Sequence, residues 1–162
     1  HGTVYAEGRS QKGNERMTYT IQNLVNSIAA QIAGAVPGYP IYDSPNQQGT
    51  EFPCFFVFLM PSDTADEIGR EKRNIWFDVV FVQERNIPGA NERINQIADT
   101  LDDMFDSISY TDGTDTVPLH THERSYSIED QELHYKFRIS QRVSYPTEQN
   151  LMQTEDLNVE VG

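Results

Sequence analysis

The sequence lacks the features by which catalytic, disulfide-bonded and membrane-spanning proteins are usually identified. Its 162 residues include one cysteine, Cys54, so no disulfide can form within the chain. No run of about 18 apolar residues occurs, and we therefore expect no membrane-spanning helix. Glycine-rich phosphate loops and the GxSxG, CxxC and HExxH motifs are also missing. We predict that the protein is not an enzyme and that it binds no cofactor and no metal.

Basic residues are scarce as well. The chain has 12 Lys and Arg against 25 Asp and Glu, which gives a net charge of −13 at pH 7. Proteins that bind nucleic-acid backbones broadly need many cations to replace the counterions of the phosphates. This composition disfavours such binding, although it is compatible with one local basic stripe.

Composition divides the chain into three parts. Residues 1–16 are polar and rich in Gly, have no periodicity and precede Met17, so we interpret them as added or translated upstream residues outside the fold. Residues 17–145 are predicted to form a single α+β domain. Residues 146–162 carry four carboxylates and no basic group, and we expect a mobile tail or a partner-binding arm.

Two segments have the periodicity of amphipathic helices, residues 18–35 and residues 90–109. Thr18 or Thr20 can provide the N-cap of the first helix, and Pro37-Gly38 follows its end. The apolar positions are Ile21, Leu24, Val25, Ile28 and Ile32 in the first helix and Ile94, Ile97, Ala98, Leu101, Met104, Phe105 and Ile108 in the second.

Five segments have the pattern of strands. They are residues 39–43, 52–60, 74–84, 117–128 and 132–144. The predicted order is α-β-β-β-α-β-β, as one mainly antiparallel sheet with both helices packed on one face. Cys54 lies in the apolar second strand, and we interpret it as a buried small hydrophobe, since no base close in sequence would activate it.

The polar segment 61–73 is predicted to be a long loop between two strands. It contains Arg70 and Arg73 and is rich in charges of both signs. Because long ordered loops are often functional, we expect this segment to be mobile in the free protein and to contact a partner in an assembly.

The strand of residues 74–84 separates two kinds of surface. Phe77 lies on its apolar face, as does Phe137 on the closing strand, and both are predicted to belong to the helix-covered core. Trp76, Val80 and Val82 lie on the opposite face, where apolar side chains need a partner such as a neighbouring subunit.

The last two strands are predicted to pair as a hairpin. If Ile128 opposes Leu133, then Tyr126 opposes Tyr135 and His122 opposes Ile139. The other face then pairs Glu123 with Arg138, an opposite-charge cross-strand pair.

One face of the closing strand is a basic stripe, defined as His134, Lys136, Arg138 and Arg142. The stripe is either a solvated face that balances Glu123 and its neighbours, or an electrostatic contact surface toward a subunit or toward DNA. Of the two contacts, that with a protein is favoured. The candidate interface residues are Trp76, Val80, Val82, Arg70, Arg73, Lys136, Arg138 and Arg142.

Two groups of residues could hold a metal, and both have a simpler interpretation. His120 and His122 share a face in a strand, but Glu123 points to the opposite face, and no further ligand has diagnostic spacing. The acidic cluster of Asp99, Asp102, Asp103 and Asp106 has helical spacing, which more often indicates a solvated face.

In the order of its segments the sequence resembles the bacteriophage tail terminators found in phages and prophages of Gram-positive bacteria. The resemblance covers about residues 17–145. It rests on the first helix before Tyr39-Pro40-Ile41-Tyr42, the strand from Phe52 to Val57, the strand from Arg73 to Phe81, the helix with Ala98-Asp99 and Leu101, and the strand from Leu133 to Phe137.

This resemblance implies a structural virion protein of the tail, assembled in the bacterial cytoplasm. Such proteins form a ring, usually a hexamer, that caps the head-proximal end of the tail tube, stops tube polymerisation and offers a docking face for the head connector. The implied partners are further copies of the chain, the tube protein and the connector, with DNA passing through the ring. The alternatives are another neck, head-completion or injection-system protein, or a small metal-dependent enzyme that uses His120 and His122.

Overall fold

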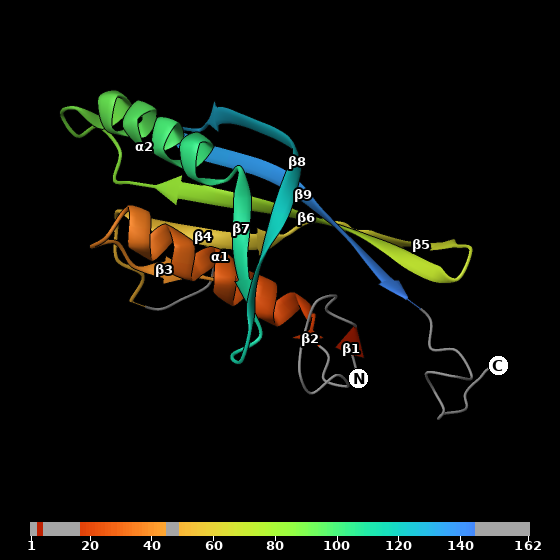
Figure 1. Ribbon diagram of the computed structural model, residues 1–162. Helices are drawn as coiled ribbons and strands as arrows, with labels where there is room; N and C mark the ends of the chain where they lie inside the picture. The colour runs from red at the N-terminus through yellow and green to blue at the C-terminus, as the bar shows by residue number, and fades with distance from the viewer. Residues whose placement is uncertain (1–2, 5–16, 45–48, 145–162) are drawn as a thin grey trace.

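The computed structural model describes residues 3–4, 17–44 and 49–144, with backbone alone at residues 3–4 and 143–144. Figure 1 shows two helices lying against a long, twisted sheet. The helices are α1 (Ile21–Ala35) and α2 (Ala90–Met104). The strands are β1 (Thr3–Val4), β2 (Met17–Thr18), β3 (Ile41–Tyr42), β4 (Cys54–Leu59), β5 (Asp63–Glu67), β6 (Arg70–Val82), β7 (Ser107–Thr111), β8 (Thr116–Glu129) and β9 (Glu132–Ser144).

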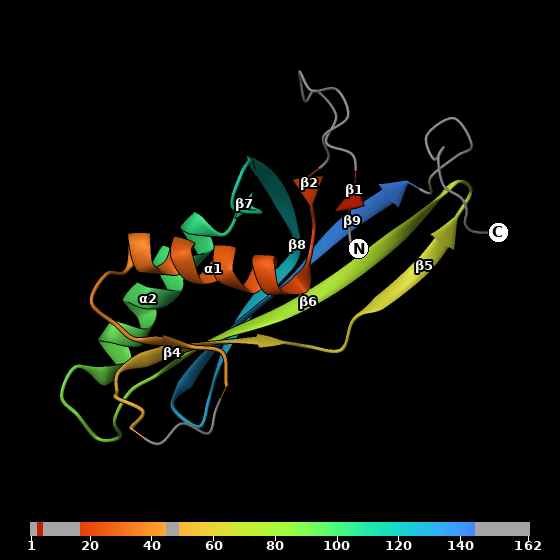
Figure 2. The same cartoon turned by 90° about the horizontal axis from the view of Figure 1, so that it is seen from below.

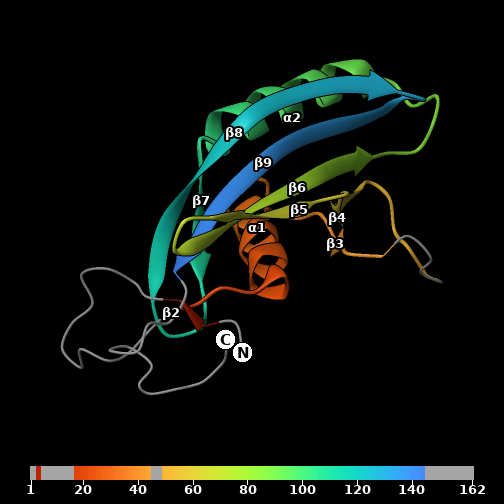
Figure 3. The same ribbon diagram turned by 90° about the vertical axis from the view of Figure 1, so that its right-hand side faces the viewer.

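The main sheet is mixed and curled. Its order is β3-β4-β6-β9-β8-β7, with β5 beside the outer part of β6. β3 runs parallel to β4, and the other pairs in the sheet are antiparallel. Figure 3 shows the long strands β8 and β9 curving over α1. The α+β class is confirmed, but the prediction of a single, mainly antiparallel sheet with the order α-β-β-β-α-β-β is wrong, because β3 is parallel to β4 and because β5 and β7 were not foreseen.

Both helices pack on the concave face of this sheet, as predicted. Figure 2 shows α1 and α2 on the same side of β6 and β9. Phe77 and Phe137 are fully buried there, and their ring centroids lie 5.9 Å apart. The main core also takes Leu24, Ile28 and Ile32 from α1 and Ile94, Ile97 and Leu101 from α2.

Helix α1 begins where its sequence offers a cap. The Oγ1 atom of Thr20 accepts a hydrogen bond from the backbone N–H of Asn23 (3.0 Å), which identifies the N-cap among the two predicted candidates. The helix ends at Ala35, and the N–H of Val36 donates to the Ile32 carbonyl (2.8 Å). The buried side chains of α1 recur at steps of three and four, so a single stripe faces the sheet.

Strand β7 is one of the elements that sequence patterning missed. We predicted that the second helix would continue to Ser109, but α2 ends at Met104 and the chain becomes extended from Ser107. Ile108 and Tyr110 are fully buried, two positions apart. Because Ile108 also continues the three- and four-residue spacing of α2, its apolar side chain fits either periodicity.

Side chains of α1 bind the outer edge of β7. The side-chain N–H groups of Gln31 donate to the carbonyls of Met104 (3.2 Å) and Ser107 (2.9 Å), and its Oε1 accepts from the N–H of Ser109 (2.9 Å). The Oγ of Ser27 accepts from the N–H of Thr111 (3.1 Å). Polar groups of α1 thus replace a neighbouring strand and satisfy an edge that would otherwise need water or a partner.

We predict that Gln31→Ala lowers the free energy of unfolding by about 1–3 kcal/mol, because three hydrogen bonds between α1 and the α2–β7 segment are lost. Gln22→Ala on the exposed side of the same helix is the matched control. The Gln22 side chain donates a hydrogen bond to Asn26, one turn further along the same helix, and this bond does not join two elements of the described chain. Urea denaturation of both variants measures the difference, and equal losses would contradict the assigned role of Gln31.

The β8–β9 hairpin has the predicted register near its turn and a different one beyond it. Tyr126 pairs with Tyr135, as expected, but a register shift between His122 and Ser125 places His122 opposite Arg138 instead of Ile139. Glu123 lies in this bulge with φ of 52°. Its carboxylate still reaches Arg138 at 3.1 Å, so the predicted ion pair is confirmed although the predicted strand alignment is wrong there.

Residues 61–73 form a β-hairpin and not the long loop that we predicted. Strand β5 pairs with the first residues of β6 through a two-residue turn at Ile68 and Gly69, and Gly69 has φ of 77°. On its other side this part of β6 pairs with the end of β9. Together β5, the outer part of β6 and the end of β9 form a three-stranded extension, called the arm below, that projects from the body of the protein (Figure 2).

The predicted domain limits, residues 17 and 145, stay predictions. The backbone of Thr3–Val4 pairs with that of Met17–Thr18, so these two residues lie against the start of the fold. The rest of residues 1–16 and the acidic segment 146–162 lie outside the described residues.

Candidate functional site

The convex face of the sheet carries an apolar groove at the end opposite the arm. This convex-face groove has a volume of about 630 Å³. Its lining residues are Gly49, Thr50, Phe52, Phe56, Phe58, Val80, Val82, Glu132 and His134. Strands β4, β6 and β9 and the segment before β4 provide these side chains, so the groove depends on the pairing of β4 with β6.

A small second core forms the floor of the groove. Cys54, Phe56 and Val80 are buried on the convex face, with Phe58 and Val82 partly buried against them. The rings of Phe56 and Phe58 are stacked, with centroids 5.4 Å apart. Burial, and then the nearby Glu132 carboxylate, raise the pKa of the Cys54 thiol, which agrees with its interpretation as a hydrophobe and not a nucleophile.

Phe52 differs from the other aromatic residues of the groove because its side chain is 46% exposed. Val80 and Val82 were predicted to need a partner on this face, and the structure places both in the groove. Trp76 lies further along β6, where the guanidinium of Arg138 stands 6.0 Å from the centre of its ring. Trp76 therefore contributes to the convex face without lining the groove.

His134, which lines the groove, forms a polar pair with Asp78 that sequence analysis did not connect. His134 Nδ1 is 2.9 Å from Asp78 Oδ2, and its Nε2 is 3.7 Å from Glu132 Oε1. Asp78 is only 6% exposed, and its Oδ1 has no hydrogen-bond partner among the described residues. Asp78 on β6 and His134 on β9 both lie on the convex face, but their contact depends on the β6–β9 register, which is a tertiary feature.

The basic stripe makes ion pairs within the same chain. Arg138 contacts Glu123 at 3.1 Å and hydrogen-bonds to Asn74 and Ser140. Arg142 lies 3.2 Å from Glu67 on the arm. Lys136 faces Asp78 across the β6–β9 pair. These contacts support the interpretation of the stripe as a face that balances local carboxylates.

The arm ends in an exposed aliphatic residue. Ile68, at the hairpin turn, is 101% exposed. Glu67 beside it receives both Arg70 (3.0 Å) and Arg142 (3.2 Å) at the same oxygen, Oε1. Arg73 pairs in register with the buried Gln141, which places Arg73 on the concave side, away from Arg70. The two arginines predicted as interface residues therefore lie on opposite faces of the arm.

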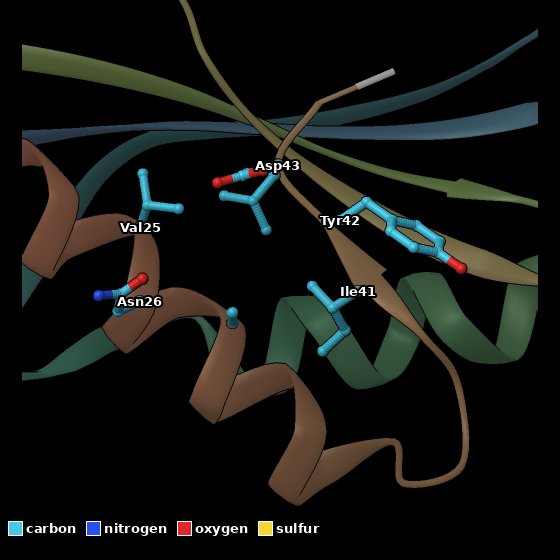
Figure 4. A pocket seen from close by; sticks show the side chains of 7 residues that line it. Val25, Asn26, Ile41, Tyr42 and Asp43 are labelled. Atoms are coloured by element: carbon cyan, nitrogen blue, oxygen red, sulfur yellow. The ribbon is translucent and has the colours of Figure 1, made fainter. Parts of the chain in front are cut away.

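A second, smaller hollow lies between α1 and β3. It has a volume of about 260 Å³ and is lined by Val25, Asn26, Ala29, Ile41, Tyr42, Asp43 and Val57. Figure 4 shows Asp43 close to Val25, whereas the Tyr42 ring is turned away from the helix. Tyr42 packs instead beside Phe56 on the convex face, with centroids 5.6 Å apart. Asp43 brings one carboxylate to this hollow, so its lining does not form a catalytic pair.

The two candidate metal groups do not form a ligand set. Within the described ranges, no group of three or more His, Cys, Asp or Glu side chains is placed to hold a metal ion. His122 lies opposite Arg138, and partial burial together with the Arg138 charge lowers the pKa of its imidazole. His120 lies opposite Ser107 on β7.

One member of the acidic cluster, Asp102 on α2, contacts neighbouring side chains. Asp102 Oδ1 accepts a hydrogen bond from the Tyr135 hydroxyl (2.7 Å) and lies 3.8 Å from Arg124. Burial and the Asp102 carboxylate raise the pKa of the Tyr135 hydroxyl.

Among the described helices, none is long and apolar enough to cross a membrane.

Comparison with known proteins gives one extensive match. The sequence model of a family described as "Phage tail terminator protein" matches residues 23–150. No curated protein matches the sequence.

Two solved structures are distantly similar. A chain from the "Virion of native gene transfer agent (GTA) particle" is 16% identical with a TM-score of 0.39, and the alignment covers 79% of this chain and 100% of that one. A second solved chain is 12% identical with a TM-score of 0.37, covering 80% of this chain and 99% of that one. Both TM-scores are below 0.5, so the likeness is weak.

Proposed function

The chain belongs to the phage tail terminator family, and on that premise we propose that it caps the head-proximal end of the tail tube as a ring of identical subunits. The family match over residues 23–150 is the observation that carries the proposal, and it identifies a structural protein of the phage tail. In the proposed role the ring stops tube polymerisation and provides the face on which the head docks. We extend the proposal to a hexamer and to the type found in phages and prophages of Gram-positive bacteria.

The surfaces of the subunit support a role in assembly. The convex-face groove leaves apolar side chains accessible, and the arm projects away from the core, so each subunit offers two features that a neighbour can cover. Among the residues described, His120 and His122 belong to no group of three or more side chains placed to hold a metal ion. The interface candidates of the sequence analysis remain candidates within this proposal.

The charge of the chain suits the passage of DNA. A net charge of −13 repels the phosphate backbone, and a ring that contacts DNA without holding it must avoid a surplus of cations in its lumen. We therefore propose that DNA passes through the ring without sequence-specific binding. The proposed protein partners are the tail tube protein and the head–tail connector, and assembly takes place in the bacterial cytoplasm.

We predict that a virus lacking this chain produces tail tubes that exceed the normal length and carry no heads. Without a cap the tube subunits continue to add, and the docking face for the head is missing. Electron microscopy of lysates gives the distribution of tube lengths, and supplying the wild-type chain from a plasmid should restore a single length and the attached heads. Tails of normal length that fail to join heads would instead indicate a neck or head-completion protein.

A further inference from the structure

We propose that the arm tip of one subunit, Ile68, seats in the convex-face groove of the next copy of this chain. The inference rests on the proposed ring, and it specifies which surfaces join neighbouring subunits. From the sequence we predicted a partner contact for residues 61–73 and an interface at Val80 and Val82, but we did not connect the two.

Ile68 is exposed in a place where an aliphatic side chain has no local use. It occupies a two-residue hairpin turn, where Gly, Asn and Asp are preferred. At 101% exposure it gains nothing from packing in its own subunit. An apolar residue at the end of a projecting hairpin has the form of an anchor for a pocket elsewhere.

The groove has the size and lining that such an anchor needs. Its volume of about 630 Å³ is within the range of clefts that hold a compact ligand, so a hairpin tip can enter it. Phe58 and Val82 offer apolar walls, and Phe52 remains 46% exposed at its mouth. Insertion of an aliphatic side chain would remove these surfaces from water.

A subunit cannot fill its own groove. Val80 in the groove and Arg70 at the arm tip lie on the same strand, β6, separated by ten residue steps. At about 3.3 Å per residue their separation is about 33 Å. Anchor and groove are therefore far apart on one molecule, and their contact between copies is head-to-tail, the kind of interface that closes into a ring when the rotation allows.

The charges beside the two surfaces are complementary. The pairings of β5, β6 and β9 place Arg70, Lys72 and Arg142 on the convex side of the arm, together with the carboxylates of Asp63 and Glu67. Three cations against two carboxylates leave a local positive surplus in a chain that is otherwise strongly acidic. Glu132 lines the groove with its side chain 36% exposed, so the arm meets a negative group there.

Disulfide trapping in assembled tails tests the contact. Cys54, which is fully buried, is first replaced by alanine (Cys54→Ala), so that only the introduced thiols can react. The double variant Ile68→Cys, Phe52→Cys is then assembled into tails, oxidised and analysed on non-reducing gels. Since the two positions are too far apart for a bridge within one chain, each disulfide must join two chains.

The expected result is a ladder of cross-linked chains that ends at the number of subunits in the ring and collapses under reducing agent. Each single variant alone should give no ladder, and co-assembly of the two single variants should give linked pairs. A self-linked Ile68→Cys variant, or a disulfide to a different tail protein, would overturn the head-to-tail contact.

A second measurement does not depend on oxidation. We expect Ile68→Asp to reduce the fraction of tubes with normal length by about tenfold or more, and Ile68→Leu to preserve it, because an aspartate cannot enter an apolar groove. If Ile68→Asp tails keep their normal length and the double cysteine variant gives no ladder, the contact is wrong although the chain is a terminator. If deletion of the whole chain leaves tube length unchanged, the proposed function itself fails.

Discussion

Phe137→Ala is expected to lower the free energy of unfolding of the free chain by about 3–5 kcal/mol, since a large aromatic side chain is removed from a site that cannot collapse. Phe137 is fully buried, and its ring centroid lies 5.0 Å from that of Phe105 and 5.9 Å from that of Phe77. Strand β9 has strands on both sides, and α2 packs against it, so the surrounding backbone is held in place. For a chain of this length the loss corresponds to a decrease of about 2–4 °C in Tm per kcal/mol.

The matched control for this prediction is Ile68→Ala. Ile68 is fully exposed in the free subunit, and its truncation should change the unfolding free energy by less than about 0.5 kcal/mol. Thermal and urea denaturation of both variants are measured on the isolated chain, so that assembly does not contribute. A loss below about 1 kcal/mol for Phe137→Ala would show that the helices do not cover this face of the sheet.

The buried faces of the sheet could be predicted from the sequence because their periodicities are long and regular. Phe137 lies between Lys136 and Arg138, and Phe77 precedes Asp78, so a charged neighbour assigns each phenylalanine to the opposite, buried face. The stripe of α1 is equally regular, and its N-cap is a threonine with the side chain that a cap requires.

The arm and β7 were not predicted, for physical reasons that differ. The arm is polar, so it has no hydrophobic period, and its hairpin is extended by the pairing of β6 with the end of β9, which lies about seventy residues further along the chain. Strand β7 is held by Gln31 and Ser27 of α1, partners that its own sequence does not reveal.

The candidate site could be predicted only as a surface. Val80 and Val82 were identified as apolar residues that need cover, but the groove also requires Phe52 and His134, from segments far apart in the sequence. The basic stripe was correctly placed on one face, yet the partners of Arg138 and Arg142 depend on a bulge and on the arm. Strand pairing between segments far apart in the sequence therefore determines which basic side chains are paired with carboxylates and which remain available for a partner.

His134→Ala is expected to lower the free energy of unfolding of the free chain by about 3–5 kcal/mol, even though the histidine itself is partly exposed. The cost arises at Asp78, which is 6% exposed and already has one oxygen without a hydrogen-bond partner among the described residues. Removing the imidazole takes away the 2.9 Å contact to the other oxygen and leaves a buried carboxylate without its partner.

The double variant His134→Ala, Asp78→Ala separates this mechanism from a simple loss of packing. If the unpaired carboxylate causes the loss, removing it as well should recover part of the stability, so the two substitutions together cost less than the sum of their single effects. Arg142→Ala is the control, because its pair with Glu67 is 46% and 30% exposed and should contribute no more than about 1 kcal/mol. Additive losses at His134 and Asp78 would contradict the coupling, and they would mean that the floor of the groove is stabilised by its apolar core of Cys54, Phe56 and Val80 alone.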